Sequence, residues 1–196
     1  MTRNTRLAKI ALSIALSVLA MTLLIITCNN QRSKRQVAEY QVPDVTLIKH
    51  TGEAVQLIDY LATAKPLILE FIYTGCTTVC PVMMIKFANL QRRLEPDTEQ
   101  VLMVSISIDP ENDTPEVLTR YREQYQAQPG WDFLTGSVAD IRKVMDAFNT
   151  RPTDMATLDT PVLLRAPGSQ SWVRLTGEID SRTFWSEYQN LLTPDQ

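Results

Sequence analysis

The chain has 196 residues, 44% of them hydrophobic and 21% charged, which suits one globular domain with a sizeable core. Its net charge of −3 is unevenly distributed, because the first 35 residues carry six basic side chains and no acidic one. Residues 36–196 therefore hold 13 basic and 22 acidic residues, a net charge of −9 (13 minus 22). An acidic body of this kind repels phosphate backbones, so nucleic acid is a poor candidate partner.

The N-terminus carries an uncharged run of 18 residues, 10–27, preceded by three basic side chains. The run is longer than the ~7–15 residues of a signal-peptide core and slightly short of the ~20 of a spanning helix. We expect residues 1–27 to be a membrane anchor or signal segment, and we favour an uncleaved anchor because no A-x-A-like cleavage site follows. A lipoprotein site at Cys28 is less favoured, since Ile26 and Thr27 are bulkier than such a site needs.

Residues 28–39 are polar and are predicted to form a linker to a folded domain at 40–196. Apolar runs, turn residues and helix-start signals then predict the elements of this domain. In chain order they are a hairpin over 43–57, a buried strand over 66–73, a helix from 76 or 77 to 94, a buried strand over 101–108, a helix starting at 113–116, a strand over 131–134, a helix over 137–148, a hairpin of 161–165 with 172–175, and a helix over 180–192. This alternation predicts an α/β fold with a central mixed sheet flanked by helices.

Cys76 and Cys80 stand where a buried strand gives way to a helix, in the motif Gly75-Cys76-Thr77-Thr78-Val79-Cys80-Pro81. Residues four apart share one helix face, and the ~6 Å rise between them lies within the Cα separation of a disulfide. A helix N-terminus also favours the thiolate, which attacks disulfides and binds Cu(I). We therefore predict Cys76 and Cys80 as the catalytic and metal-binding residues.

Two other roles for the pair are less favoured. A stapling disulfide that closes a loop over three residues removes little entropy from the unfolded chain. A closed zinc site needs four ligands, and only Cys28 and His50 remain as classical candidates. We expect His50 to be a solvent-exposed turn residue.

The sequence resembles the Sco/SenC family of copper-site assembly factors for cytochrome c oxidase. The resemblance rests on two segments, 71–81 (FIYTGCTTVCP) and 104–118 (VSISIDPENDTPEVL). It implies a thioredoxin-like fold with an added N-terminal hairpin and a single N-terminal membrane anchor. It also implies Cu(I) as cofactor, the copper-binding oxidase subunit as partner, and a domain on the periplasmic side of a bacterial inner membrane.

The chain departs from the family at the third copper ligand, which is a histidine before the late hairpin. Thr157 or Thr160 stands there, depending on how the segment is matched. The sequence Thr160-Pro161 instead resembles the Thr-Pro of thioredoxins, where the proline is cis and faces the redox pair. We predict a cis bond at Pro161, the alternative being a proline that starts a strand.

Other residues admit two interpretations each. Asp109 either tunes the thiols or fixes the turn before the next helix. Met83 and Met84 are predicted to be core residues rather than Cu(I) ligands, while Met155, in the loop without the histidine, is the more interesting soft ligand.

Three functions remain open from the sequence. The first is a metallochaperone that holds Cu(I) on two thiolates. The second is a thiol–disulfide oxidoreductase, supplied by an upstream thiol reductant, that keeps oxidase cysteines reduced. The third is a non-catalytic redox-sensing module on the same scaffold.

Overall fold

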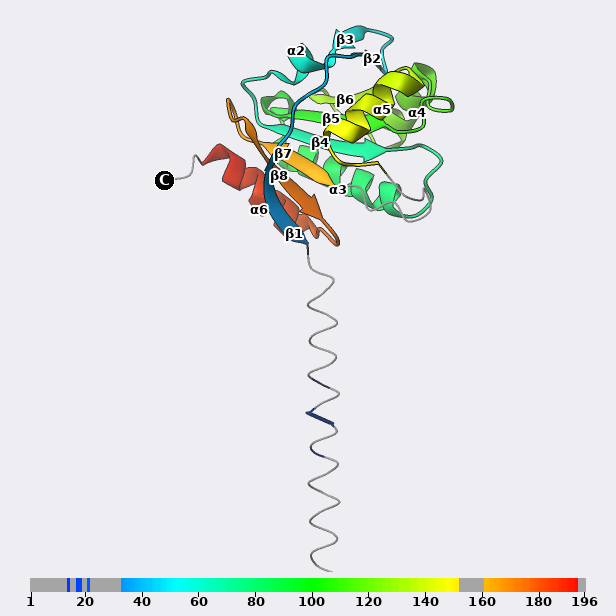
Figure 1. Cartoon of the computed structure of the whole chain (residues 1–196). Helices are drawn as coiled ribbons and strands as arrows, with labels where there is room; N and C mark the ends of the chain where they lie inside the picture. The colour runs from blue at the N-terminus through cyan, green and yellow to red at the C-terminus, as the bar shows by residue number, and fades with distance from the viewer. Residues whose placement is uncertain (1–13, 15–16, 19–20, 22–32, 152–160, 194–196) are drawn as a thin grey trace, which may run out of the picture. The chain divides into compact units, whose positions relative to one another are not determined.

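A mixed sheet of eight strands forms the centre of the computed structural model, which describes residues 14, 17–18, 21, 33–151 and 161–193 (Figure 1). The described strands are β1 (Lys34–Glu39), β2 (Thr46–Lys49), β3 (Ala54–Gln56), β4 (Leu67–Ile72), β5 (Leu102–Ser107), β6 (Trp131–Thr135), β7 (Val162–Arg165) and β8 (Ser171–Thr176). Their order across the sheet is β1-β8-β7-β4-β5-β6-β2-β3. The pairs β4–β5 and β5–β6 are parallel, and all other neighbours are antiparallel.

Helices cover both faces of this sheet. They are α2 (Leu57–Leu61), α3 (Val79–Leu94), α4 (Pro115–Gln124), α5 (Val138–Ala147) and α6 (Ser181–Leu192), with a short 3₁₀ turn η1 (Thr98–Gln100). Alternate side chains of β4 point to opposite faces, as strand geometry requires. Ile68 and Ile72 join a core with α3, α4 and α6, while Leu69 and Phe71 join a second core with α2 and α5. The central strand is therefore buried on both sides, as its near-continuous apolar sequence, interrupted only by Glu70, predicts.

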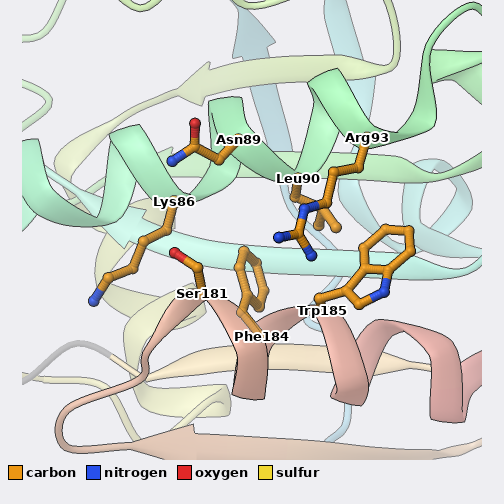
Figure 2. A pocket seen from close by; sticks show the side chains of 7 residues that line it. All are labelled: Lys86, Asn89, Leu90, Arg93, Ser181, Phe184 and Trp185. Carbon is orange, nitrogen blue, oxygen red and sulfur yellow. The ribbon is translucent and has the colours of Figure 1, made fainter.

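The packing of α3 against α6 fixes the helix that carries Cys80. Figure 2 shows Leu90 of α3 facing Phe184 of α6, with Arg93 reaching over Trp185. The guanidinium carbon of Arg93 lies 5.2 Å from the Trp185 ring centroid, a cation–π arrangement. The centroid of the Phe184 ring also lies 5.1 Å from that of Phe87, so aromatic contacts hold the second half of α3 against α6.

The predicted mixed α/β sheet flanked by helices is confirmed, and each element predicted between residues 43 and 192 is present within a few residues. One difference lies at the N-terminal end of the domain. Residues 34–39, predicted to belong to a linker, form β1, and the compact unit begins at Lys34. The strand escaped prediction because it is held by backbone pairing to β8 while its one large apolar side chain, Val37, is exposed. The short helix α2 was also not predicted.

Among the described residues, no helix has both the length and the apolar character needed to cross a membrane. The predicted membrane segment, 10–27, lies mostly outside the described residues. Four further residues named above also lie outside the described residues: Cys28, Met155, Thr157 and Thr160.

Candidate functional site

The two motif cysteines are positioned by different pieces of structure. Cys80 lies in the first turn of α3 and packs within the core. Cys76 precedes the helix, in a turn that follows β4 and is closed by its own N–H donating to the carbonyl oxygen of Tyr73 at 3.1 Å. Residue Thr78, which precedes α3, makes no side-chain capping bond. The place of Cys80 thus depends on the helix, and that of Cys76 depends on the turn.

The structure brings the two cysteines together, as the spacing predicts, and both are free thiols. Cys76 is 5% exposed and Cys80 is 2% exposed. The backbone N–H of Cys80 donates to the sulfur of Cys76 at 3.3 Å, and the hydroxyl oxygen of Thr78 lies 3.9 Å from the same sulfur. Donors at the start of α3 therefore converge on one of the two sulfurs.

This asymmetry separates the pKa values of the two thiols. Burial by itself would raise the pKa of Cys76, but hydrogen bonds from the Cys80 thiol and from backbone N–H groups outweigh it and lower the pKa to about 7. Burial raises the pKa of Cys80 to about 12, and the neighbouring Cys76 sulfur acts in the same direction. Near neutral pH Cys76 is about half thiolate while Cys80 stays a thiol, an arrangement suited to nucleophilic exchange.

Asp113 is a part of the site that the sequence did not reveal. The helix predicted to start at 113–116 is capped by Thr114, whose hydroxyl accepts from the N–H of Val117. Asp113 is instead fully buried and binds Thr74, which lies two residues before Cys76. In the sequence, Asp113 stood out only as a member of the second family-like segment, 104–118.

Asp109 follows β5 and makes local contacts. Its carboxylate accepts from the side-chain amide of Asn112 at 2.9 Å, and its carbonyl accepts from the N–H of Asp113 at 2.9 Å. These bonds agree with the interpretation of Asp109 as a turn residue.

The candidate soft ligands on α3 belong to the core. Met83 and Met84 are 8% and 0% exposed and pack with Phe87, as predicted. The part of the chain that the structure describes contains no group of three or more His, Cys, Asp and Glu side chains able to hold a metal.

The prediction of a solvent-exposed His50 was wrong. The side chain is only 10% exposed, and its Nδ1 accepts from the N–H of Phe133 at 3.3 Å. Its ring also meets the ring of Phe133 edge to face. His50 lies in the turn after β2, but the neighbouring β6 covers it, which a turn sequence cannot show.

The segment that carries the two thiols has no charged side chain of its own. Residues 71–85 include no Asp, Glu, Lys, Arg or His. Val79, Val82 and Ile85 are exposed on the same helix, at 41%, 50% and 52%. The two sulfurs suit a soft ion, which prefers sulfur ligands to the oxygen ligands that hard cations take.

A family model described as SCO1/SenC matches residues 33–162, more than half of the chain. The chain belongs to the SCO1/SenC family. Its curated relatives include the SCO1 protein homolog of Bacillus subtilis, 33% identical over 58% of each chain. Protein SenC of Rhodobacter capsulatus is 33% identical over 58% of this chain and 52% of its own. These matches span little more than half the length of either relative.

Solved Sco structures share the fold. BsSco, a Sco-family cytochrome c oxidase assembly protein with a disulfide switch, aligns with a TM-score of 0.65 and 25% identity over 80% of this chain and 95% of its own. ScoI of Arabidopsis thaliana, solved with copper bound, aligns at 0.62 and 26% identity over 79% and 98%. The family thus includes copper-bound members and members that act in cytochrome c oxidase assembly.

Proposed function

We propose that this chain is a membrane-anchored Sco protein, with its domain outside the cytoplasm, that uses Cys76 and Cys80 to assemble the copper site of cytochrome c oxidase. The observation that carries the proposal is the pair itself, in which a thiolate-favouring Cys76 lies beside a protonated Cys80 at the start of α3. The relatives' roles in copper binding and oxidase assembly point the same way.

The pair suits Cu(I) as cargo. Cu(I) accepts low coordination and prefers sulfur, so two thiolates suffice without a histidine. Binding would displace the proton of Cys80, while Cys76 is already half ionised near pH 7. Cu(II), which favours nitrogen ligands and higher coordination, gains less from this site.

The pair also suits reduction of target cysteines. The Cys76 thiolate attacks one sulfur of a target disulfide, and the other target sulfur leaves as a thiolate. Cys80 then gives up its proton and attacks the Cys76 sulfur, which releases the second target thiol. The target gains two electrons, the Cys76–Cys80 pair becomes a disulfide, and an upstream thiol reductant must return it to the dithiol form.

The alternative is a thiol–disulfide oxidoreductase with no copper role. The high pKa of Cys80 favours it, because a resolving cysteine that stays protonated does not compete with the first attack. A redox-sensing module would show neither turnover nor tight metal binding.

The deciding experiment adds Cu(I), and separately Cu(II), to the reduced full chain carrying Cys28→Ser, which removes the third thiol. We expect one Cu(I) per chain held against a competing chelator, weak Cu(II) binding, and loss of the Cu(I) site in Cys76→Ser and Cys80→Ser. Met84→Leu, a core change on the same helix, is the matched control and should retain Cu(I). If neither ion binds tightly but the pair exchanges disulfides, the oxidoreductase replaces the copper carrier.

A further inference from the structure

Asp113 is a buried carboxylate on which three hydrogen bonds converge. It is 0% exposed. The N–H of Thr74 donates to it at 3.1 Å and the hydroxyl of Thr74 at 2.5 Å, while the hydroxyl of Ser107 donates at 2.5 Å. A carboxylate removed from water is costly unless such bonds replace its hydration, so these contacts are a fixed feature of the fold.

Asp113 is itself held by the segment between β5 and α4. Its N–H donates to the carbonyl of Asp109 at 2.9 Å. The hydroxyl of Ser107, at the end of β5, donates to Asp113 and accepts from the N–H of Asp109 at 3.0 Å. The carboxylate is therefore anchored to the end of a central strand and reaches across to a turn 39 residues earlier.

The turn that carries Cys76 is the less constrained part of the site, so a bond to Asp113 affects it most. Both cysteines pack in the same core, but only Cys80 is also held by α3, whereas Cys76 stands outside the helix. Gly75, between Thr74 and Cys76, is exposed and is the residue type with the freest backbone. A tether on Thr74 restricts the segment that carries the Cys76 sulfur.

We propose that Asp113 is a positioning residue for the thiol pair. By holding Thr74 it places the Cys76 sulfur beside Cys80 and so raises the effective concentration of one sulfur at the other. The inference rests on the proposed function of the pair. A disulfide and a two-sulfur Cu(I) complex both need the two sulfurs together, so both weaken by a similar factor when the tether is lost.

The test compares variants of the full chain in a Cys28→Ser background. The first measurement is the equilibrium constant for Cys76–Cys80 disulfide formation in glutathione buffers, and the second is Cu(I) affinity by chelator competition. We expect Asp113→Ala to lower both constants by about tenfold. Asp113→Asn should keep both within about twofold, because its amide oxygen can accept from Thr74 and its NH₂ can donate to Ser107.

Two further variants separate positioning from general stability. Thr74→Val removes one of the tethering bonds, so it should lower both constants by about threefold and add little to Asp113→Ala in a double-mutant cycle. Gln91, at the far end of α3, is as buried as Asp113, and its side-chain amide donates to the carbonyls of Gln128 and Pro129. Gln91→Ala is therefore the control for general stability. It should lower the melting temperature and leave both constants unchanged.

The inference is overturned by unchanged constants in folded Asp113→Ala, or by equal losses in Gln91→Ala. If Asp113→Ala does not fold, Thr74→Val decides, and unchanged constants there overturn the inference as well. A parent chain that neither forms the disulfide nor binds Cu(I) overturns the proposed function and the inference with it. If the parent chain forms the disulfide and binds Cu(I), but the variants at Asp113 and Thr74 leave both constants unchanged, only the inference is overturned.

Discussion

The backbone N–H of Cys80 lies 3.3 Å from the sulfur of Cys76, so the start of α3 directly stabilises negative charge on the residue that precedes it. The helix dipole adds to this bond because its positive end points toward the same sulfur. The two cysteines therefore differ in chemistry although they differ little in burial.

The first prediction concerns selective alkylation of Cys76. With its pKa lowered to about 7, Cys76 should react with iodoacetamide at a rate that rises with pH up to a midpoint near neutrality and then levels. Cys80, with its pKa raised to about 12, should stay unmodified over the same range. Peptide mapping by mass spectrometry on the Cys28→Ser chain measures both rates. A Cys76 midpoint near 9, or faster labelling of Cys80, would contradict the asymmetry.

The second prediction concerns the pH dependence of Cu(I) affinity. Below pH ~7 both thiols are protonated, so binding releases two protons and the affinity should rise about 100-fold per pH unit. Between pH ~7 and ~10 only Cys80 still carries a proton, so the rise should fall to about tenfold per unit. Chelator competition at pH 5.5, 6.5, 7.5 and 8.5 resolves the two slopes. Met84→Leu, the core change on the same helix, is the control and should show the same two slopes.

The part of the thiol site that lies within one short segment was predictable from the sequence. The spacing of Cys76 and Cys80 and the strand–turn–helix context indicated two sulfurs at a helix start. Asp113 was not predictable, because its contact with Thr74 joins segments 39 residues apart and depends on how β4 and β5 pair. The burial of His50 escaped for the same reason, since its covering residue, Phe133, lies on another strand.

The third prediction concerns Glu70, a buried carboxyl on β4. Burial raises its pKa to about 8, against the opposing effect of the Ser105 hydroxyl that donates to it at 2.7 Å. The pKa of Glu70 in the folded state lies above the unfolded value of about 4.5, so between these two values the folded state keeps a proton that the unfolded state has lost. Stability tied to this group is fully present below pH ~4.5 and is lost as pH rises to ~8.

Gln at position 70 cannot ionise, so the melting temperature of Glu70→Gln should rise relative to that of the parent as the pH increases from 5 to 8. Each kcal/mol corresponds to about 2–4 °C in a domain of this size. Thermal unfolding followed by circular dichroism measures the difference. Glu116→Gln is the control, because that carboxyl is exposed and its pKa is lowered by the Thr114 hydroxyl, so it should show no such gain. A constant difference between Glu70→Gln and the parent across pH would argue that Glu70 is ionised throughout.

Sequence patterns did not predict β1, the strand at the N-terminal boundary of the domain, for a physical reason. Strand prediction depends on alternating burial, and β1 shows none, because five of its six side chains are exposed and the sixth, Ala38, is half-buried. Its six residues are held instead by backbone pairing with β8, from Lys34 opposite Thr176 to Glu39 opposite Ser171. Backbone hydrogen bonds leave no signature in the sequence of one strand.

The fourth prediction tests this strand. A chain that starts at residue 40 should melt several degrees below one that starts at 34, because it loses the β1–β8 ladder and the ion pair of Arg35 with Glu187 at 3.1 Å. It should also aggregate more readily, since β8 becomes an open edge strand. Val37→Thr in the longer chain is the control and should change the melting temperature little, because that side chain is 56% exposed. Equal melting temperatures for the two chains would mean that residues 34–39 act as the linker that their composition indicated.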